Sequence, residues 1–359
     1  MRGVLGVLIA IMPAVALAQA PEPTPPAAEP AGAPIPPVAE PAAAPAPPTP
    51  SAPPAEATPR SPPATRFMLS DLTVLRLNPL GLETRARIGI QKRLYASTKP
   101  ITQNNFMFAG VYPKLNPVSA HLAVGGELQP ASIFNLRATV EVQKYFGILG
   151  YLQSFPSATA NYSDQRLKDL RDDPTREPQT ATIYHASLQP LLQLKVGPIA
   201  VRALFQLDYW ALRIRDGDTV AYEATFDTLL PDNGWTLSTD TDVLFIGRPG
   251  LAIGVRHTWV KPFYRDSHFA SGGDRAAYEG DNGHQRAGLF AAYTLRDRGP
   301  STFNKPTVIL IASWYLTHRW RTGEQTDIAA DTTDDDFTPR AFPYLLAGFA
   351  FESDFLPAR

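Results

Sequence analysis

Two polar residues two positions apart, His185 and Ser187, have the types that support nucleophilic catalysis. On an extended strand, residues at this spacing share a face, so the imidazole could take the proton of the hydroxyl. The sequence offers no third carboxylate that can be named as the group orienting His185. Both residues also belong to the polar face of their expected strand. In a sheet that closes into a β-barrel, such a polar face points inwards. We therefore expect no catalytic residue and no enzymatic activity.

The other groups that could hold a metal or a cofactor lack a supporting spacing. The sequence has no cysteine, which removes thiolate ligands and Cys nucleophiles. Spacings such as His-x3-His are missing among the other histidines, which are His121, His257, His268, His284 and His318. The acidic run 327–336 lacks the spacing of a Ca²⁺ loop and reads as a solvated charged loop. We expect no metal and no cofactor.

Alternating apolar and polar residues over 184–196 and 199–213 predict the two strands around this pair. In the second run, apolar residues such as Phe205 alternate with polar ones such as Arg202, and a short Gly-Pro turn joins the runs into a hairpin. Each run reaches the ~9–11 residues that a tilted strand needs to cross a bilayer. Soluble strands are usually shorter, at about 5–6 residues. The pattern is typical of a transmembrane β-barrel.

The same alternation predicts an all-β, antiparallel up-and-down barrel of ten strands. They are expected at 82–94, 119–129, 133–145, 184–196, 199–213, 235–246, 251–260, 285–296, 307–319 and 342–355. Short turns at 130–132, 197–198, 247–250 and 297–306 alternate with long polar loops at 95–118, 146–180, 214–234, 261–283 and 320–340. Since outer-membrane barrels have short periplasmic turns and long external loops, both termini are expected in the periplasm. If 105–112 also pairs and Asp216-Gly217 closes a further hairpin, the count becomes twelve.

The polar register of these strands carries charges that a barrel would point into its lumen. The candidate lumen or pore-lining residues are Arg85, Arg87, Arg137, Glu141, Lys195, Arg202, Asp208, Asp240, Asp242, Arg256 and Arg286. Barrels of about eight strands are filled by side chains, whereas those of about sixteen leave a wide aqueous channel. The charges therefore predict either a paired, partly hydrated interior network or a narrow polar pore or ligand cavity. Both alternatives use the same residues.

Residues 1–64 are predicted to contain a signal peptide followed by a linker. Residues 1–18 combine a basic start, a short apolar run and an Ala-x-Ala end, which predicts a secretory signal peptide. Residues 19–64 are rich in Pro and Ala and predict a disordered periplasmic linker, for which peptidoglycan is one candidate partner. The composition changes at Thr65, where we place the start of a barrel domain over 65–359. The net charge of −1 leaves no electrostatic footprint for nucleic acid, so none is expected as a partner.

The chain ends in alternating apolar residues that close on Phe355. This end resembles the C-terminal β-signal of Gram-negative outer-membrane proteins, and the resemblance covers about 80–355 at the level of architecture. It departs from the pattern because Leu356-Pro357-Ala358-Arg359 follow the aromatic residue, which is usually last. The resemblance implies a barrel in the Gram-negative outer membrane, contact with its lipid, and insertion by the barrel-assembly machinery through the last strand.

The His185-Ala186-Ser187 stretch also resembles the His-x-Ser of barrel-embedded lipid A deacylases. In those enzymes the active site faces the lipid, whereas this pair falls in the lumen register. We therefore predict a non-enzymatic outer-membrane barrel, either a narrow porin-like channel for small solutes or a structural barrel whose function lies in its surface loops. The alternatives are a barrel-embedded lipid-modifying hydrolase and a soluble secreted β-protein.

Overall fold

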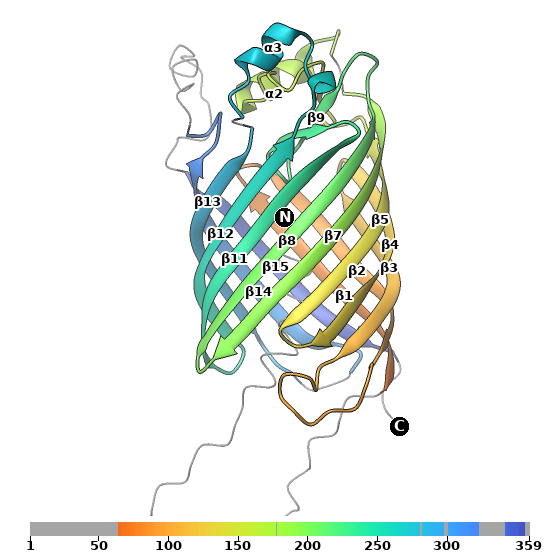
Figure 1. Ribbon diagram of the computed structural model, residues 1–359, viewed down its shortest axis with the longest axis vertical. Helices are drawn as coiled ribbons and strands as arrows, with labels where there is room; N and C mark the ends of the chain where they lie inside the picture. The colour runs from red at the N-terminus through yellow and green to blue at the C-terminus, as the bar shows by residue number, and fades with distance from the viewer. Residues whose placement is uncertain (1–63, 177, 281, 298–300, 323–341, 356–359) are drawn as a thin grey trace, which may run out of the picture.

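The computed structural model describes residues 64–176, 178–280, 282–297, 301–322 and 342–355. Its main element is an antiparallel sheet closed into a twelve-strand barrel (Figure 1). The barrel strands are β1 (Thr65–Leu77), β2 (Gly81–Lys92), β3 (Phe106–Asn116), β4 (Ser119–Ala131), β5 (Phe134–Phe146), β7 (Thr180–Val196), β8 (Ile199–Arg213), β11 (Gly234–Arg248), β12 (Leu251–Phe263), β13 (His284–Thr294), β14 (Asn304–Thr317) and β15 (Tyr344–Asp354). The predicted signal peptide, nearly all of the predicted linker and the acidic run 327–336 lie outside the described residues.

The barrel closes where its first and last strands meet. β1 pairs antiparallel with β15, which places Leu72 opposite Ala350. On its other edge β1 pairs with β2, which places Leu72 opposite Arg85. Closure gives every one of these strands a neighbour on both edges, so the backbone hydrogen bonds are satisfied within the sheet.

The prediction of ten strands is wrong, and the alternative of twelve is correct. All ten predicted segments are strands, and β1 and β3 are the two additions. β3 contains the 105–112 segment that the alternative proposed, apart from its first residue. The other addition is Thr65–Leu77 and not a barrel hairpin closed by Asp216-Gly217.

Both missed strands carry apolar residues on both faces, which hides the period of two. In β1, Leu72 is buried on the inward face, while Leu75 is exposed on the outward face. In β3, Phe108 is buried inside and Val111 is exposed outside. Alternation of apolar and polar residues predicts a strand only where the two faces of that strand lie in different surroundings.

The two ends of the barrel differ in their connections. β1 begins and β15 ends at one end, here called the terminal end, and the opposite end is called the loop end (Figure 1). The first and last strands thus start and finish on one side, as predicted. However, β2 runs from the loop end to the terminal end, opposite to the predicted direction, because β1 precedes it. Residues 95–118 are therefore not one external loop, since they contain β3 and the turn before β4.

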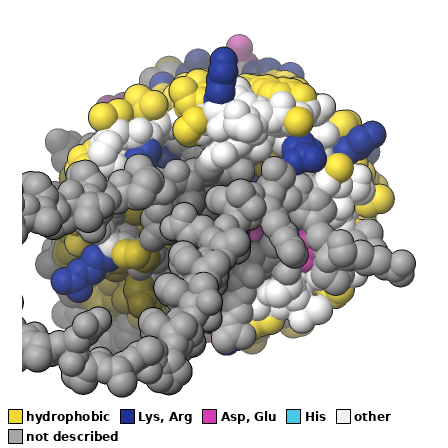
Figure 2. All heavy atoms as spheres, turned by 90° about the horizontal axis from the view of Figure 1, so that it is seen from below, with side chains coloured by type: hydrophobic (Ala, Val, Ile, Leu, Met, Phe, Trp, Pro, Cys, Tyr) yellow, Lys and Arg dark blue, Asp and Glu magenta, His cyan; other side chains and the backbone are white. Residues whose placement is uncertain are grey.

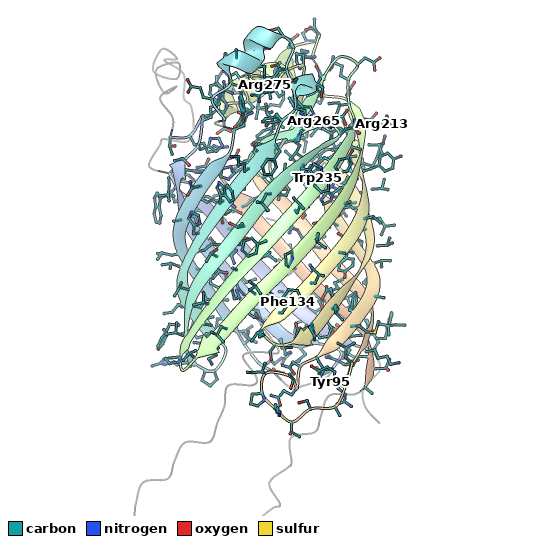
Figure 3. The ribbon with its side chains drawn as sticks, viewed as in Figure 1. Tyr95, Phe134, Arg213, Trp235, Arg265 and Arg275 are labelled. Atoms are coloured by element: carbon teal, nitrogen blue, oxygen red, sulfur yellow. The ribbon has the colours of Figure 1, made fainter. Side chains whose placement is uncertain are left out.

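The outward face of the barrel is apolar and the inward face is largely polar. Val140 and Leu310 on the outward face are 59% and 54% exposed, whereas Arg87 on the inward face is 1% exposed. Trp235 is exposed near the loop end (Figure 3), and Tyr184, close to the start of β7, is exposed there too. This arrangement is the reverse of a water-soluble protein, which buries apolar groups and exposes charges.

One side of the interior wall is apolar. Buried residues of β13, β14, β15 and β1, including Phe290, Ile309 and Leu72, form a hydrophobic cluster there, which extends to Ala200 of β8 and Leu244 of β11. The remaining inward wall, from β2 round to β12, carries most of the interior charges.

Exposed basic residues surround the terminal end, as Figure 2 shows from below. Lys92, Lys99 and Arg248 are exposed at this rim. Among the described residues, no helix is long and apolar enough to span a membrane.

Candidate functional site

The structure places every predicted lumen residue on the inward face of its strand. All are buried except Lys195, which is partly exposed near the terminal end. They do not form one site but fall into separate groups along the wall. The ion pairs join neighbouring or next-neighbouring strands, so the charged side chains lie along the wall rather than across the barrel axis.

The first group centres on Glu127, a residue of β4 that the sequence did not single out. Its Oε1 accepts from Nε of Arg87 at 2.9 Å and from Nε of Arg137 at 2.8 Å. The Tyr112 hydroxyl donates to the same carboxylate at 3.2 Å. The Arg87 guanidinium also lies 3.5 Å from the centre of the Phe108 ring. One carboxylate thus compensates two buried guanidinium groups.

The second group contains the His185 of the predicted catalytic pair. Its Nε2 lies 2.6 Å from Oδ1 of Asp208, and its Nδ1 lies 3.6 Å from Oε1 of Glu141. The imidazole is stacked on Trp210 with ring centres 4.0 Å apart.

Ser187, the other half of the pair, accepts a hydrogen bond from Nε2 of Gln189 at 3.0 Å. Asp208 is the carboxylate that the sequence could not name, because it lies on β8, opposite Ser187 in the strand register. The imidazole of His185 therefore faces a carboxylate at each of its ring nitrogens.

The third group joins Arg202, Asp242 and Arg256 on three adjacent strands. Nε and Nη2 of Arg256 donate to the two oxygens of Asp242 at 2.7 and 2.8 Å, and Arg202 donates to the same carboxylate. Within the described part of the chain, Nε and Nη1 of Arg202 and Nη1 of Arg256 find no hydrogen-bond partner. Nη1 of Arg256 still lies 3.6 Å from Oδ2 of Asp240 in an ion pair, so Nε and Nη1 of Arg202 are the donors left to a further ligand.

Two further predicted residues have partners outside these groups. Arg85 pairs with Glu83 two positions away on the same face of β2. The Arg286 guanidinium lies 3.9 Å from the centre of the Tyr344 ring. Asp240 accepts from the Thr258 hydroxyl at 2.5 Å and lies 3.6 Å from Nη1 of Arg256, which connects it to the third group.

The loop end is closed by a hairpin that the sequence analysis did not foresee. Residues 214–234 were predicted as a long external loop. Instead, the short strands β9 (Val220–Glu223) and β10 (Thr228–Pro231) form a hairpin in which every residue from 220 to 231 is buried. β9 also pairs with β6 (Ser154–Phe155) in a small three-stranded sheet.

The tip of this mouth hairpin packs against the inner wall. Phe226 lies edge-on to Trp210, an inward residue of β8, with ring centres 5.7 Å apart. Phe226 and Leu230 share a hydrophobic cluster with Ile183 and Leu212, which are inward residues of β7 and β8. The apolar residues Phe226, Leu229 and Leu230 were a signal for this burial, because large apolar side chains are uncommon in a loop that is fully exposed to water.

The hairpin tip is held by Asp227. Its carboxylate accepts from Arg321 in two places, with Nε to Oδ2 at 2.6 Å and Nη2 to Oδ1 at 3.1 Å. The Tyr315 hydroxyl donates to the same group at 2.7 Å, and Nε2 of His318 lies 3.3 Å away. Burial acts to raise the pKa of Asp227, but the charges of Arg321 and His318 outweigh it and hold this pKa well below its usual range.

Arg321 also ties this contact to the helical part of the cap. Its Nη1 donates to Oδ2 of Asp164 at 2.8 Å, and to the Asn78 side chain in the β1–β2 turn at 2.5 Å. Asp164 opens α2 (Asp164–Asp172), whose N-cap is Ser163. A single guanidinium therefore connects the hairpin, a helix and a barrel turn.

The rest of the cap covers the loop end, where Figure 3 labels Arg265 and Arg275. It includes η1 (Asp266–His268) and α3 (Gly272–Ala277) between β12 and β13. Phe269, Tyr222 and Leu170 share one hydrophobic cluster, which joins this segment to the hairpin and α2. In the described ranges, no group of three or more His, Cys, Asp or Glu residues could hold a metal ion.

Several solved β-barrels are similar to this chain. The NanC porin is 9% identical with a TM-score of 0.36, and the match covers 80% of this chain and 100% of that one. The KdgM porin is 10% identical with a TM-score of 0.34, covering 80% and 99%. An outer membrane channel from Pseudomonas putida F1 is 10% identical with a TM-score of 0.39, covering 82% and 96%.

At these TM-scores the similarities carry no argument about this chain, and the fold rests on the strand pairing described above. No protein-family model and no curated protein matches the chain.

Proposed function

We propose that this chain is a Gram-negative outer-membrane channel for small polar solutes, with the loop end facing outwards. The observation that carries the proposal is the inverted distribution of its side chains. Exposed apolar residues cover the outward face of the strands, and paired charges occupy the inward face. Lipid on the outside and water within the lumen are the surroundings that suit this distribution.

The strand lengths support placement in a membrane. Barrel strands run from 11 residues in β3 to 17 residues in β7. A tilted strand needs about 9–11 residues to cross the hydrocarbon core, so each strand is long enough. The exposed Trp235, Tyr184 and Phe263 near the loop end suit an interfacial aromatic girdle.

The charge arrangement supports a passage rather than a filled core. Because the ion pairs run along the wall between nearby strands, they do not bridge the lumen. Arg202 keeps two buried donors, Nε and Nη1, that find no hydrogen-bond partner among the described residues, and water or a solute in the lumen would satisfy them. We infer that the Arg202–Asp242–Arg256 group contributes to solute selectivity.

The closed loop end favours a second candidate function. The β9–β10 hairpin packs inside the loop end of the barrel. Such a barrel is also suited to present its surface loops to a partner without conducting ions or solutes. In that case the function lies in the cap, which includes α2 and α3.

Single-channel recording of the purified, refolded protein in a planar bilayer separates the two functions. Heat-modifiable migration in gels serves as the folding control. Discrete current steps support the channel. A folded barrel that gives no steps, in the native form and after weakening of the mouth hairpin, overturns the channel and leaves the surface-display function.

A further inference from the structure

The outward face carries one carboxylate far from either end of the barrel. Asp71 lies near the middle of β1 and is partly exposed. It accepts hydrogen bonds from the Thr84 hydroxyl at 3.1 Å and from the Thr73 hydroxyl at 3.4 Å. These three outward residues are called the acidic patch below.

A carboxylate at this depth needs a partner if the outward face lies in lipid, so the inference rests on that part of the proposed function. Hydrocarbon offers no hydrogen-bond donor, and ionisable groups at mid-depth are costly unless they are paired. Two threonine hydroxyls satisfy part of the carboxylate but do not compensate its charge. Lipid headgroups cannot reach it, because they lie at the ends of the strands.

A second polar group lies at a similar depth on another side of the barrel. His257, near the middle of β12, has its Nε2 3.1 Å from Oε1 of Gln285 on β13. These two residues are called the basic patch. On the described strands, the basic outward residues outside this patch lie towards the strand ends, and they include Lys92, Lys144, Arg213 and Lys261.

We propose that the acidic patch of one copy of this chain binds the basic patch of a second copy within the membrane. The chemistry is complementary, because the side-chain amide of Gln285 and an imidazole N–H are hydrogen-bond donors, and the carboxylate of Asp71 is an acceptor. Asp71 and His257 are both central in their strands, so copies standing side by side in one orientation bring these two residues level. The contact replaces lipid around Asp71 with the donors that it lacks.

The position of the patches fixes the kind of assembly. They lie on different sides of the barrel, with β14 and β15 between β13 and β1 on the shorter way round. The contact is therefore head-to-tail, which builds a row or a ring rather than a two-fold dimer.

The absence of cysteine from the sequence allows a clean crosslinking test. Ala86 is opposite Asp71 in the strand register, and Thr241 is opposite His257. In a head-to-tail contact between parallel barrels, these two flanking positions face each other. Ala86→Cys and Thr241→Cys leave the residues of both patches unchanged.

The two single variants are co-expressed, and isolated outer membranes are oxidised with copper–phenanthroline. The proposal expects a crosslinked dimer only when both variants are present, at least tenfold above the pair Ala138→Cys and Thr241→Cys. Ala138 is the matched control, since it is exposed on the outward face of β5. Adding Asp71→Leu to the Ala86→Cys chain is expected to abolish the crosslink.

Two results would overturn the proposal. One is a yield no higher than the Ala138 control, and the other is efficient crosslinking of Ala86→Cys with itself. The readout does not depend on conduction. Crosslinking without current steps therefore rejects the channel alone, and current steps without crosslinking reject the association alone.

Discussion

Arg321 binds Asp227 through two parallel hydrogen bonds, Nε to Oδ2 at 2.6 Å and Nη2 to Oδ1 at 3.1 Å. The contact joins the tip of the mouth hairpin to the segment that follows β14. Asp227 is 1% exposed, so water does not compete for its carboxylate. Two-point geometry and burial together make this contact the main polar restraint on the hairpin.

Replacing Asp227 by Asn is expected to loosen the hairpin. The change leaves Arg321 buried with Asp164 as its remaining acidic partner, and breaking a buried pair costs about 3–5 kcal/mol. Current steps in planar bilayers should become larger or more frequent. Asp216→Asn is the control, because Asp216 is exposed in the same connection. Equal currents in the two variants would show that the hairpin does not restrict the mouth.

Replacing Arg202 by Gln is expected to lower the anion-to-cation permeability ratio of the channel. Arg256 still binds Asp242 through two hydrogen bonds, so the carboxylate stays in place while one positive charge is lost. A unit charge at about 4 Å is worth on the order of 1 kcal/mol in water. The anion-to-cation permeability ratio should fall by roughly fivefold. Reversal potentials in a salt gradient measure it.

Lys144→Gln is the control for this measurement, because Lys144 is exposed on the outward register near the loop end. An unchanged ratio in Arg202→Gln would count against a conduction path beside Arg202.

Replacing Glu127 by Gln is expected to destabilise the barrel. Arg87 and Arg137 both donate to this carboxylate, and the variant leaves two buried guanidinium groups without their charge partner. We expect a loss of about 3–5 kcal/mol in the free energy of unfolding. Denaturant titration of the refolded protein measures this loss. Glu279→Gln, at an exposed cap residue, should stay within about 0.5 kcal/mol of the parent.

His268 is expected to titrate below the usual range for histidine. Burial lowers its pKa, although its hydrogen bond to the Asp232 carbonyl acts in the opposite direction. The backbone N–H of Arg265 donates to Nδ1 at 2.8 Å, a contact that requires an unprotonated ring nitrogen. The stability that this residue contributes is therefore present above about pH 6.5 and is lost as pH falls through the folded pKa.

Nuclear magnetic resonance of the ring protons, assigned with His268→Gln, follows this titration. A midpoint at or above 6.5 would contradict the neutral, Nε2-protonated form.

Sequence alternation alone determined the barrel class and the inward register. The predicted segments 199–213 and 251–260 lie in β8 and β12, and Arg202 and Arg256 are buried on the inward faces of these strands. This was possible because the outward and inward faces of these strands have different surroundings, so apolar and polar residues alternate along the sequence with a period of two. Where the lumen wall is itself apolar, as beside Leu72 in β1, that signal is lost.

Tertiary structure decided which charges meet and what closes the mouth. Asp208 lies beside His185, and Asp227 beside Arg321, only because strand register and loop folding bring distant segments together. Residue types and spacing do not predict such pairs, because the two partners belong to segments that are far apart in the sequence. The burial of 220–231 arises in the same way, because its apolar residues find a surface only once β7 and β8 are in place.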